Sequence, residues 1–187
     1  MTATTNNAAS PRLKITTPGD WLTIDLDLLA AVDDSAVPDP GLTRAIRYLK
    51  SVATGLLEVG VAFGAVMVER GSTDALAMVS CLVATAPPDE MSLDEFVKSS
   101  PPPDAVEGTF SVTTVDNRAS ETVRFECLRR AVLEIPSPDA VSFAVEYLTR
   151  LPGSNRMLVT TFSTPNAAEP DRYRALFDSI ASSIEVM

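Results

Sequence analysis

The chain contains no histidine. Histidine is the commonest general base, a frequent zinc and iron ligand, and the usual partner of a nucleophilic serine or cysteine. Cysteine is almost as scarce, because Cys81 and Cys127 are the two in 187 residues, and a cysteine-rich zinc site is thereby excluded. We therefore expect no metal, no cofactor and no catalytic residues, and a protein that is not an enzyme.

The two cysteines lie inside apolar segments that resemble strands, where free cysteine behaves as a small buried hydrophobe. We expect free thiols in preference to a disulfide, because a cytoplasmic setting disfavours disulfides. Arg124, Arg129 and Arg130 surround Cys127 and could lower the pKa of its thiol. The alternative, which we favour, is an unreactive thiol on an edge or partly exposed strand.

Long hydrophobic runs are also missing. The run from Val59 to Val68 is far shorter than the roughly 20 apolar residues that a membrane helix needs. The first ten residues have neither the basic region nor the apolar region of a signal peptide. We expect a cytoplasmic protein, with export by a non-classical route left open.

Basic residues are few relative to acids, and the net charge is −10. Residues 20–39 contain six acids and no base, and residues 89–107 contain six acids and one lysine. A field of this sign repels phosphate backbones and anionic lipids, which argues against a nucleic-acid or membrane partner. It favours a basic protein partner, while the alternative is that both segments are solvated loops.

The length favours one domain. We expect a disordered tail over residues 1–11 and a single α+β domain over residues 12–187. Asp39 and Pro40 begin a helix with apolar residues at helical spacing as far as Gly60. Apolar or alternating patterns predict strands at 12–16, 21–26, 61–69, 76–85, 108–115, 122–135, 140–151 and 157–163. The pair at 61–69 and 76–85 is expected to be a central hairpin covered on both faces, and the last four strands an antiparallel meander.

The segment from Trp21 to Leu26 alternates polar and apolar residues, which is typical of a half-buried strand that starts a hairpin with residues 12–16. Such a strand would place Asp25 and Asp27 on one face, as an acid/base pair requires. Because both lie in the first acidic segment, we favour simple solvation.

The C-terminal segment has the clearest pattern. After the strand at 157–163, Tyr173, Phe177, Ile180 and Ile184 recur at helical spacing. We expect a helix that packs on the sheet.

The second acidic segment includes a proline-rich excursion at about 87–103. Proline pairs or triplets lie at both ends, and Ser92 to Glu95 form a capping box that begins a short helix. We predict an apolar anchor with an acidic rim, as a site for a basic partner would have. The predicted partner-binding residues are Asp89, Glu90, Leu93, Asp94, Glu95 and Phe96. The alternative is that Phe96 and Val97 only attach the loop to the sheet.

The order of these elements, with Pro18-Gly19-Asp20-Trp21 near the start and Leu158 to Phe162 followed by the Tyr173 to Ile184 helix near the end, resembles the PsbP-like superfamily. That group includes photosystem accessory proteins, a Ran-binding adaptor and bacterial LpqN-type members. The resemblance implies an α+β fold, an antiparallel sheet flanked by helices in an αβα sandwich, in which Trp21 anchors the core. It also implies a non-catalytic binder. The proline-rich excursion and the lack of an export signal depart from the lipoprotein members.

Two functions follow from these observations. The first is a non-enzymatic protein-binding module, an adaptor, chaperone or neutralising partner, that presents acidic loops to a basic protein. The alternative is a carrier of a small apolar ligand between sheet and helix.

Overall fold

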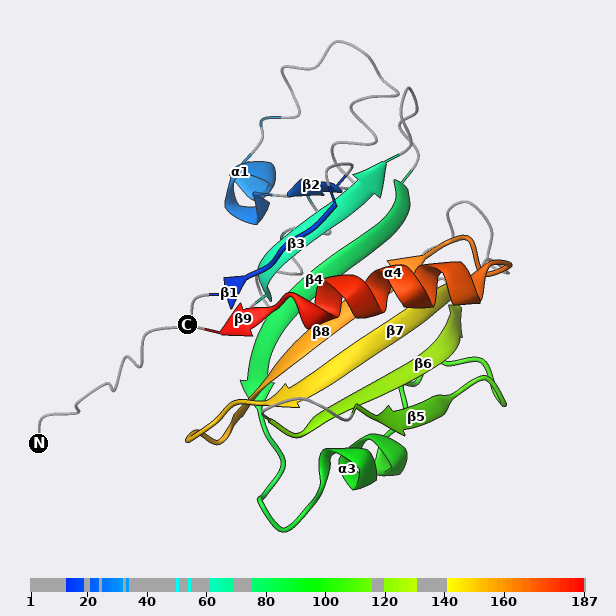
Figure 1. Ribbon diagram of the computed structural model, residues 1–187. Helices are drawn as coiled ribbons and strands as arrows, with labels where there is room; N and C mark the ends of the chain where they lie inside the picture. The colour runs from blue at the N-terminus through cyan, green and yellow to red at the C-terminus, as the bar shows by residue number, and fades with distance from the viewer. Residues whose placement is uncertain are drawn as a thin grey trace, which may run out of the picture.

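The computed structural model describes residues 13–18, 21–23, 25–31, 33, 50, 54, 61–68, 75–115, 120–130 and 141–186 (Figure 1). Within these residues, helices and strands follow one another along the chain without a repeating order. In order they are β1 (Leu13–Lys14), β2 (Trp21–Thr23), α1 (Leu26–Ala31), β3 (Val61–Val68), β4 (Ala75–Thr85), α3 (Leu93–Ser99), β5 (Ser111–Thr114), β6 (Thr122–Arg130), β7 (Val141–Arg150), β8 (Arg156–Thr164), α4 (Pro170–Ser182) and β9 (Glu185–Val186). None of the described helices is long and apolar enough to span a bilayer.

The main sheet has seven strands in the order β2-β3-β4-β8-β7-β6-β5, and every neighbouring pair is antiparallel. The predicted meander of the last four strands is confirmed. It joins the β3–β4 hairpin through β4 and β8, where Cys81 lies opposite Thr160. The long, mostly apolar run of β4 fits this central position, where β4 has a partner strand on each side.

Helix α4 covers one face of the sheet (Figure 1). Its residues Tyr173, Phe177 and Ile180 are all at most 2% exposed. The ring of Phe177 stacks on Phe162 of β8 at a centroid distance of 4.8 Å. Residues three and four apart lie on the same side of a helix, and this is the side that meets the sheet. The predicted C-terminal strand and helix are confirmed.

Helix α3 covers the opposite face at one end, where it contacts β5 and β6. Leu93 and Val97 pack there with Phe125, Leu148 and Met157. Leu148 follows Tyr147, which belongs to the core under α4. Because successive residues of a strand point to opposite faces, α3 and α4 lie on opposite sides of the sheet. The predicted fold class, an antiparallel sheet flanked by helices, is confirmed.

The start of the described chain differs from the prediction. Strand β1 pairs with β9 in a separate two-stranded sheet, and β2 pairs with β3, so the expected hairpin of residues 12–16 with 21–26 is wrong. The C-terminal helix is also shorter than expected. Helix α4 ends at Ser182, before Ile184, and β9 follows. These pairings join residues far apart in the chain, so local patterns do not reveal them.

The side chains of β2 correct one expectation and confirm another. Trp21 is 7% exposed and belongs to the core, as predicted. Leu22 is 56% exposed, although a half-buried strand with the predicted alternation would place this apolar side chain toward the core. Met78 of β4 is 38% exposed, so the central hairpin is not fully covered on both faces.

Several predictions lie outside the described residues. These are the disordered tail at 1–11, residues 131–135 of the sixth predicted strand, and nearly all of the helix at 39–60. In that helix only Lys50 and Thr54 are described, both helical, and the Thr54 hydroxyl donates to the Lys50 carbonyl at 2.9 Å. The division into a tail and one domain stays a prediction.

Candidate functional site

The acidic segment between β4 and β5 has an ordered centre in α3. The backbone N–H of Glu95 donates to Ser92 Oγ at 3.2 Å, and the backbone N–H of Ser92 donates to Glu95 Oε2 at 3.1 Å. These reciprocal bonds satisfy two amide donors that a helix start leaves unpaired. The capping box predicted from the sequence is therefore confirmed, and it occupies the Glu95 carboxylate.

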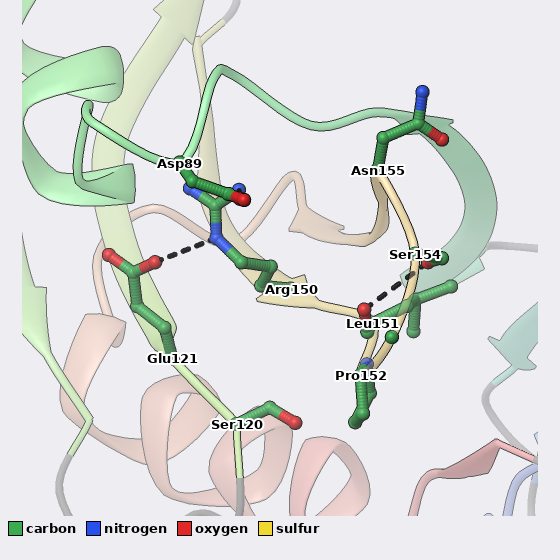
Figure 2. A pocket seen from close by; sticks show the side chains of 9 residues that line it. Asp89, Ser120, Glu121, Arg150, Leu151, Pro152, Ser154 and Asn155 are labelled. Atoms are coloured by element: carbon green, nitrogen blue, oxygen red, sulfur yellow. Dashed lines mark hydrogen bonds and ion pairs between the residues drawn. The ribbon is translucent and has the colours of Figure 1, made fainter.

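Arg150, the last residue of β7, holds the beginning of the same segment. Its guanidinium donates to the carbonyl oxygens of Pro87 at 2.9 Å and Met91 at 3.0 Å. It also donates to Glu121 Oε2 at 3.0 Å and lies 3.4 Å from an oxygen of Asp89 (Figure 2). A guanidinium has five N–H donors in a fixed planar fork, whereas a lysine ammonium has three on a single nitrogen. One side chain thus attaches the 87–91 loop to the end of the sheet.

Glu121 completes this attachment from the start of β6. Its second oxygen accepts from the backbone N–H of Leu93 at 2.7 Å, which is the first residue of α3. Around this group lies an open hollow of about 560 Å³ (Figure 2). Its lining is polar or backbone for the most part and consists of Asp89, Ser120, Glu121, Arg150, Leu151, Pro152, Gly153, Ser154 and Asn155. The hollow separates the acidic loop from the turn between β7 and β8.

The six predicted partner-binding residues do not form one surface. Leu93 is 0% exposed and Phe96 is half-buried against the same core, so the predicted apolar anchor faces the sheet. This corrects the prediction for Leu93, which no partner can contact in the folded chain. The physical reason is that a two-turn helix can bury its apolar side in only one place, and the sheet already offers Phe125 and Leu148.

The four acidic residues have different surroundings. The side chain of Asp89 is 96% exposed, and Glu90 is exposed as well. Asp94 pairs with Lys98 at 2.8 Å, an i,i+4 pair on α3. Glu95 is engaged in the capping box. Asp89 lies 3.4 Å from Arg150 but is almost fully exposed, so Asp89 and Glu90 are the most accessible acids of this segment.

A second polar group, which the sequence patterns did not indicate, lies on the sheet face that carries α3. Arg129 of β6 pairs with Glu146 of β7, and Arg129 Nε is 3.9 Å from Asp104. Burial raises the pKa of Glu146, and the Arg129 guanidinium acts in the opposite direction. Glu146 is a charged residue between apolar neighbours in the middle of β7, and this is the sequence signal that could have indicated the polar group.

The opposite face uses ion pairs to fasten α4. Asp178 accepts from Arg124 at 3.1 Å and from the hydroxyl of Tyr147, while Arg174 donates to Glu126 at 2.7 Å. The Arg174 guanidinium also lies over the Phe143 ring at 5.6 Å. These groups join helix to strands, and we assign them a structural role.

The other sequence candidates are separated by the fold. Strand β2 ends at Thr23 and α1 begins at Leu26, so Asp25 and Asp27 do not share a strand face. Asp34 and Asp39, which belong to the first acidic segment, lie outside the described residues. Within the described ranges, no three side chains of cysteine, aspartate and glutamate lie together as ligands for a metal ion.

The two cysteines are free and buried, and each is at most 1% exposed. Burial raises the pKa of Cys81 to about 11. Burial also raises the pKa of Cys127, although its contact with Arg129 acts in the opposite direction. Strand β6 lies between β5 and β7, so it is not an edge strand, whereas the expected partial exposure is present in four half-buried residues and the exposed Arg130. The thiolate required for reaction is suppressed at both positions.

We expect neither thiol to react with an aromatic disulfide reagent at pH 8 while the protein is folded. Both should react fully once guanidinium chloride unfolds the chain, which provides the internal control. Absorbance of the released chromophore measures the number of thiols labelled. Complete labelling of Cys127 in protein with an unchanged circular dichroism spectrum would contradict this expectation.

No family model matches the chain, and no curated protein matches it in sequence. In structure it is similar to LpqN of Mycobacterium tuberculosis, a protein involved in cell envelope biogenesis, with 11% identity and a TM-score of 0.47 over 98% of this chain and 87% of that one. It is also similar to the cyanobacterial PsbP protein, CyanoP, of Synechocystis, with 14% identity and a TM-score of 0.46 over 100% of this chain and 98% of that one. The antiparallel sheet flanked by helices that the sequence led us to expect is the architecture described above.

Proposed function

We propose that this protein is a non-enzymatic protein-binding module whose acidic loop, residues 87–95, docks on a basic partner. The proposal rests on the observation that some residues of this loop attach it to the sheet while others are exposed. Its apolar residues and Arg150 fix it to the sheet. The side chains of Asp89 and Glu90 are exposed, although Asp89 lies 3.4 Å from the Arg150 guanidinium. The acids are thus presented on a fixed support.

A loop that is already held in place loses less conformational entropy when a partner binds, and this favours affinity. Immobilising a side chain or loop at an interface costs on the order of 0.5 to 1.5 kcal/mol per residue with many rotamers. Here the hydrogen bonds from Arg150 to Pro87 and Met91 hold the backbone before any partner arrives. The capping box does the same for the start of α3.

The surface chemistry fits a basic partner. The exposed carboxylates of Asp89 and Glu90 lie next to Met91, which is 38% exposed. An exposed apolar side chain beside charged ones resembles the core and rim of a small interface. Opposite charge on the partner would accelerate encounter and exclude acidic proteins.

A pull-down from the native host with three forms of the full chain tests the proposal. The forms are the wild type, the double variant Asp89→Asn with Glu90→Gln, and a control with Asp27→Asn and Glu107→Gln. The control removes the same charge from exposed acids outside the loop. Asp94 and Glu95 are kept, because Lys98 and the capping box use them.

We expect the wild type and the control to retain a common basic protein, identified by mass spectrometry, that the loop variant loses. The complex should also dissociate at about 0.5 M salt, where the Debye length falls below roughly 5 Å. Retention of the same partner at full strength by the loop variant would place the binding surface elsewhere.

A second function, a carrier of a small apolar ligand, is favoured by one specific observation. A cavity of about 270 Å³ lies between the sheet and the segment formed by α3 and the proline triplet at 101–103. The cavity thus lies between sheet and helix, where the carrier hypothesis places the ligand.

A further inference from the structure

The cavity between α3 and the sheet has an apolar lining with one ionisable group in the described residues. The sheet contributes Phe125, Leu148, Met157 and Val159 together with Glu146. The covering segment contributes Phe96, Val97, Ser100 and the three prolines. Aromatic and aliphatic walls with one placed polar group are typical of a small-molecule site.

The charges around Glu146 do not balance. Two carboxylates, Glu146 and Asp104, share the single guanidinium of Arg129. The sum over these three ionised groups is −1. Among the described residues that line the cavity there is no lysine or arginine to supply the missing positive charge.

The Glu146 carboxylate keeps acceptor capacity for a further donor. Arg129 donates to one of its oxygens from Nη2, while the Nε of Arg129 is 3.9 Å from Asp104 and has no hydrogen-bond partner among the described residues. The guanidinium therefore does not form two parallel bonds with Glu146, and an ionised carboxylate can accept several hydrogen bonds. Thr161 of β8, opposite Glu146 in the sheet, is the further polar neighbour of that carboxylate.

We propose that this cavity binds a small apolar amine, with its ammonium group on Glu146 and its hydrocarbon body against Phe125, Leu148 and Val159. The inference rests on the second function, the carrier, and names the class of its ligand. The ammonium supplies the charge that Arg129 alone does not. Its N–H donors meet the carboxylate of Glu146, the one ionisable residue in the described lining.

The volume limits the size of the ligand. A cavity of about 150 Å³ accepts benzene, and drug-sized ligands take roughly 300 to 1,000 Å³. A cavity of about 270 Å³ therefore suits one ring with a short chain. We choose 4-phenylbutylamine as the probe, with 4-phenylbutanol and 4-phenylbutyrate as neutral and anionic analogues of the same shape.

The test is a titration of the full isotope-labelled chain with each probe, followed by amide chemical shifts in NMR. We expect the amine to bind at least tenfold more tightly than the alcohol and the butyrate to bind least. The shifts should centre on the lining residues, such as Phe96, Phe125, Leu148 and Val159. The ammonium and the Glu146 carboxylate attract each other as opposite charges, the alcohol is neutral, and the butyrate is repelled as a like charge, which sets this order.

Two variants locate the interaction. Glu146→Gln should weaken the amine about tenfold and leave the alcohol unchanged, and Glu107→Gln, at an exposed position, should change neither. Val159→Phe fills the cavity and should abolish binding of both probes. If Glu146→Gln does not fold, the order of the three probes on the wild type still decides the matter.

The outcomes separate the two levels of the proposal. Equal binding of amine and alcohol within the cavity overturns the amine and leaves the carrier intact. Binding of no probe, or shifts centred elsewhere, overturns both. None of these results bears on the acidic loop, because Asp89 and Glu90 do not line this cavity.

Discussion

Phe177→Ala is expected to lower the free energy of unfolding by about 3 to 5 kcal/mol. Phe177 is 0% exposed, stacks on Phe162 and has the Tyr173 ring at 5.9 Å. Truncation removes the ring and leaves a cavity between α4 and the sheet, which a packed core fills only in part. Because whole domains are stabilised by roughly 5 to 15 kcal/mol, this is a large share of the total. Denaturation with urea, followed by circular dichroism, measures the change.

Ser179→Ala provides the matched control, since Ser179 is an exposed residue of the same helix. We expect its effect to stay within about 0.5 kcal/mol. A chain that ends at Pro165 lacks α4 and β9 altogether and should lose its cooperative unfolding transition. An unchanged transition in that shortened chain, or a Phe177→Ala effect no larger than that of the control, would show that α4 is not part of the core.

Arg150→Ala should destabilise the protein by about 1 to 3 kcal/mol and release the acidic loop. The side chain is 18% exposed, and its loss removes the donor to the carbonyls of Pro87 and Met91 and to one oxygen of Glu121. Leaving a buried polar group unsatisfied carries this cost, and Pro87 is the buried residue among the three, since Met91 and Glu121 are exposed to water. Arg150→Lys should be intermediate, because an ammonium keeps the charge and cannot form the fork.

Hydrogen exchange distinguishes loop release from general weakening. In Arg150→Ala the amides of residues 89–93 should exchange faster, and those of β8 should change only with global stability. Arg172→Ala is the control, since Arg172 is 70% exposed in its pair with Glu169 and exposed pairs contribute about 0 to 1 kcal/mol. Unaltered exchange at 89–93 in the Arg150 variant would mean that other contacts hold the loop.

Periodicity within a segment was enough to predict much of the sheet and α4. Strands β6 and β8 and helix α4 have patterns in which buried residues recur mostly at the period of the element. Strand β7 is instead an apolar run that is buried on both faces at its centre. The pairings of β4 with β8 and of β1 with β9 were not predictable in this way. They depend on which distant strands bury the most apolar surface together, and that is a property of the whole chain.

The candidate site shows the same limit at the scale of single residues. Leu93 and Glu95 were both assigned to a partner, and the structure uses Leu93 for the core and Glu95 for the helix cap. An apolar side of a short helix looks the same in sequence whether it faces a sheet or a partner. Arg150 was not singled out, because two of its acceptors are backbone carbonyls that any residue could provide, and the carboxylates of Glu121 and Asp89 are 29 and 61 residues away in the chain.

The position of β4 beside β8 has a consequence for synthesis on the ribosome. Cys81 and Thr160, which face each other across this pair, are 79 residues apart in the chain. At roughly 5 to 20 residues per second, β4 waits on the order of 4 to 16 s for its neighbour to emerge. During that time its apolar edge can pair with other chains, and an unpaired edge of this kind favours aggregation. Expression at lower temperature or with a chaperone that shields such edges should therefore raise the yield of folded protein more than changes to the protein's surface charge.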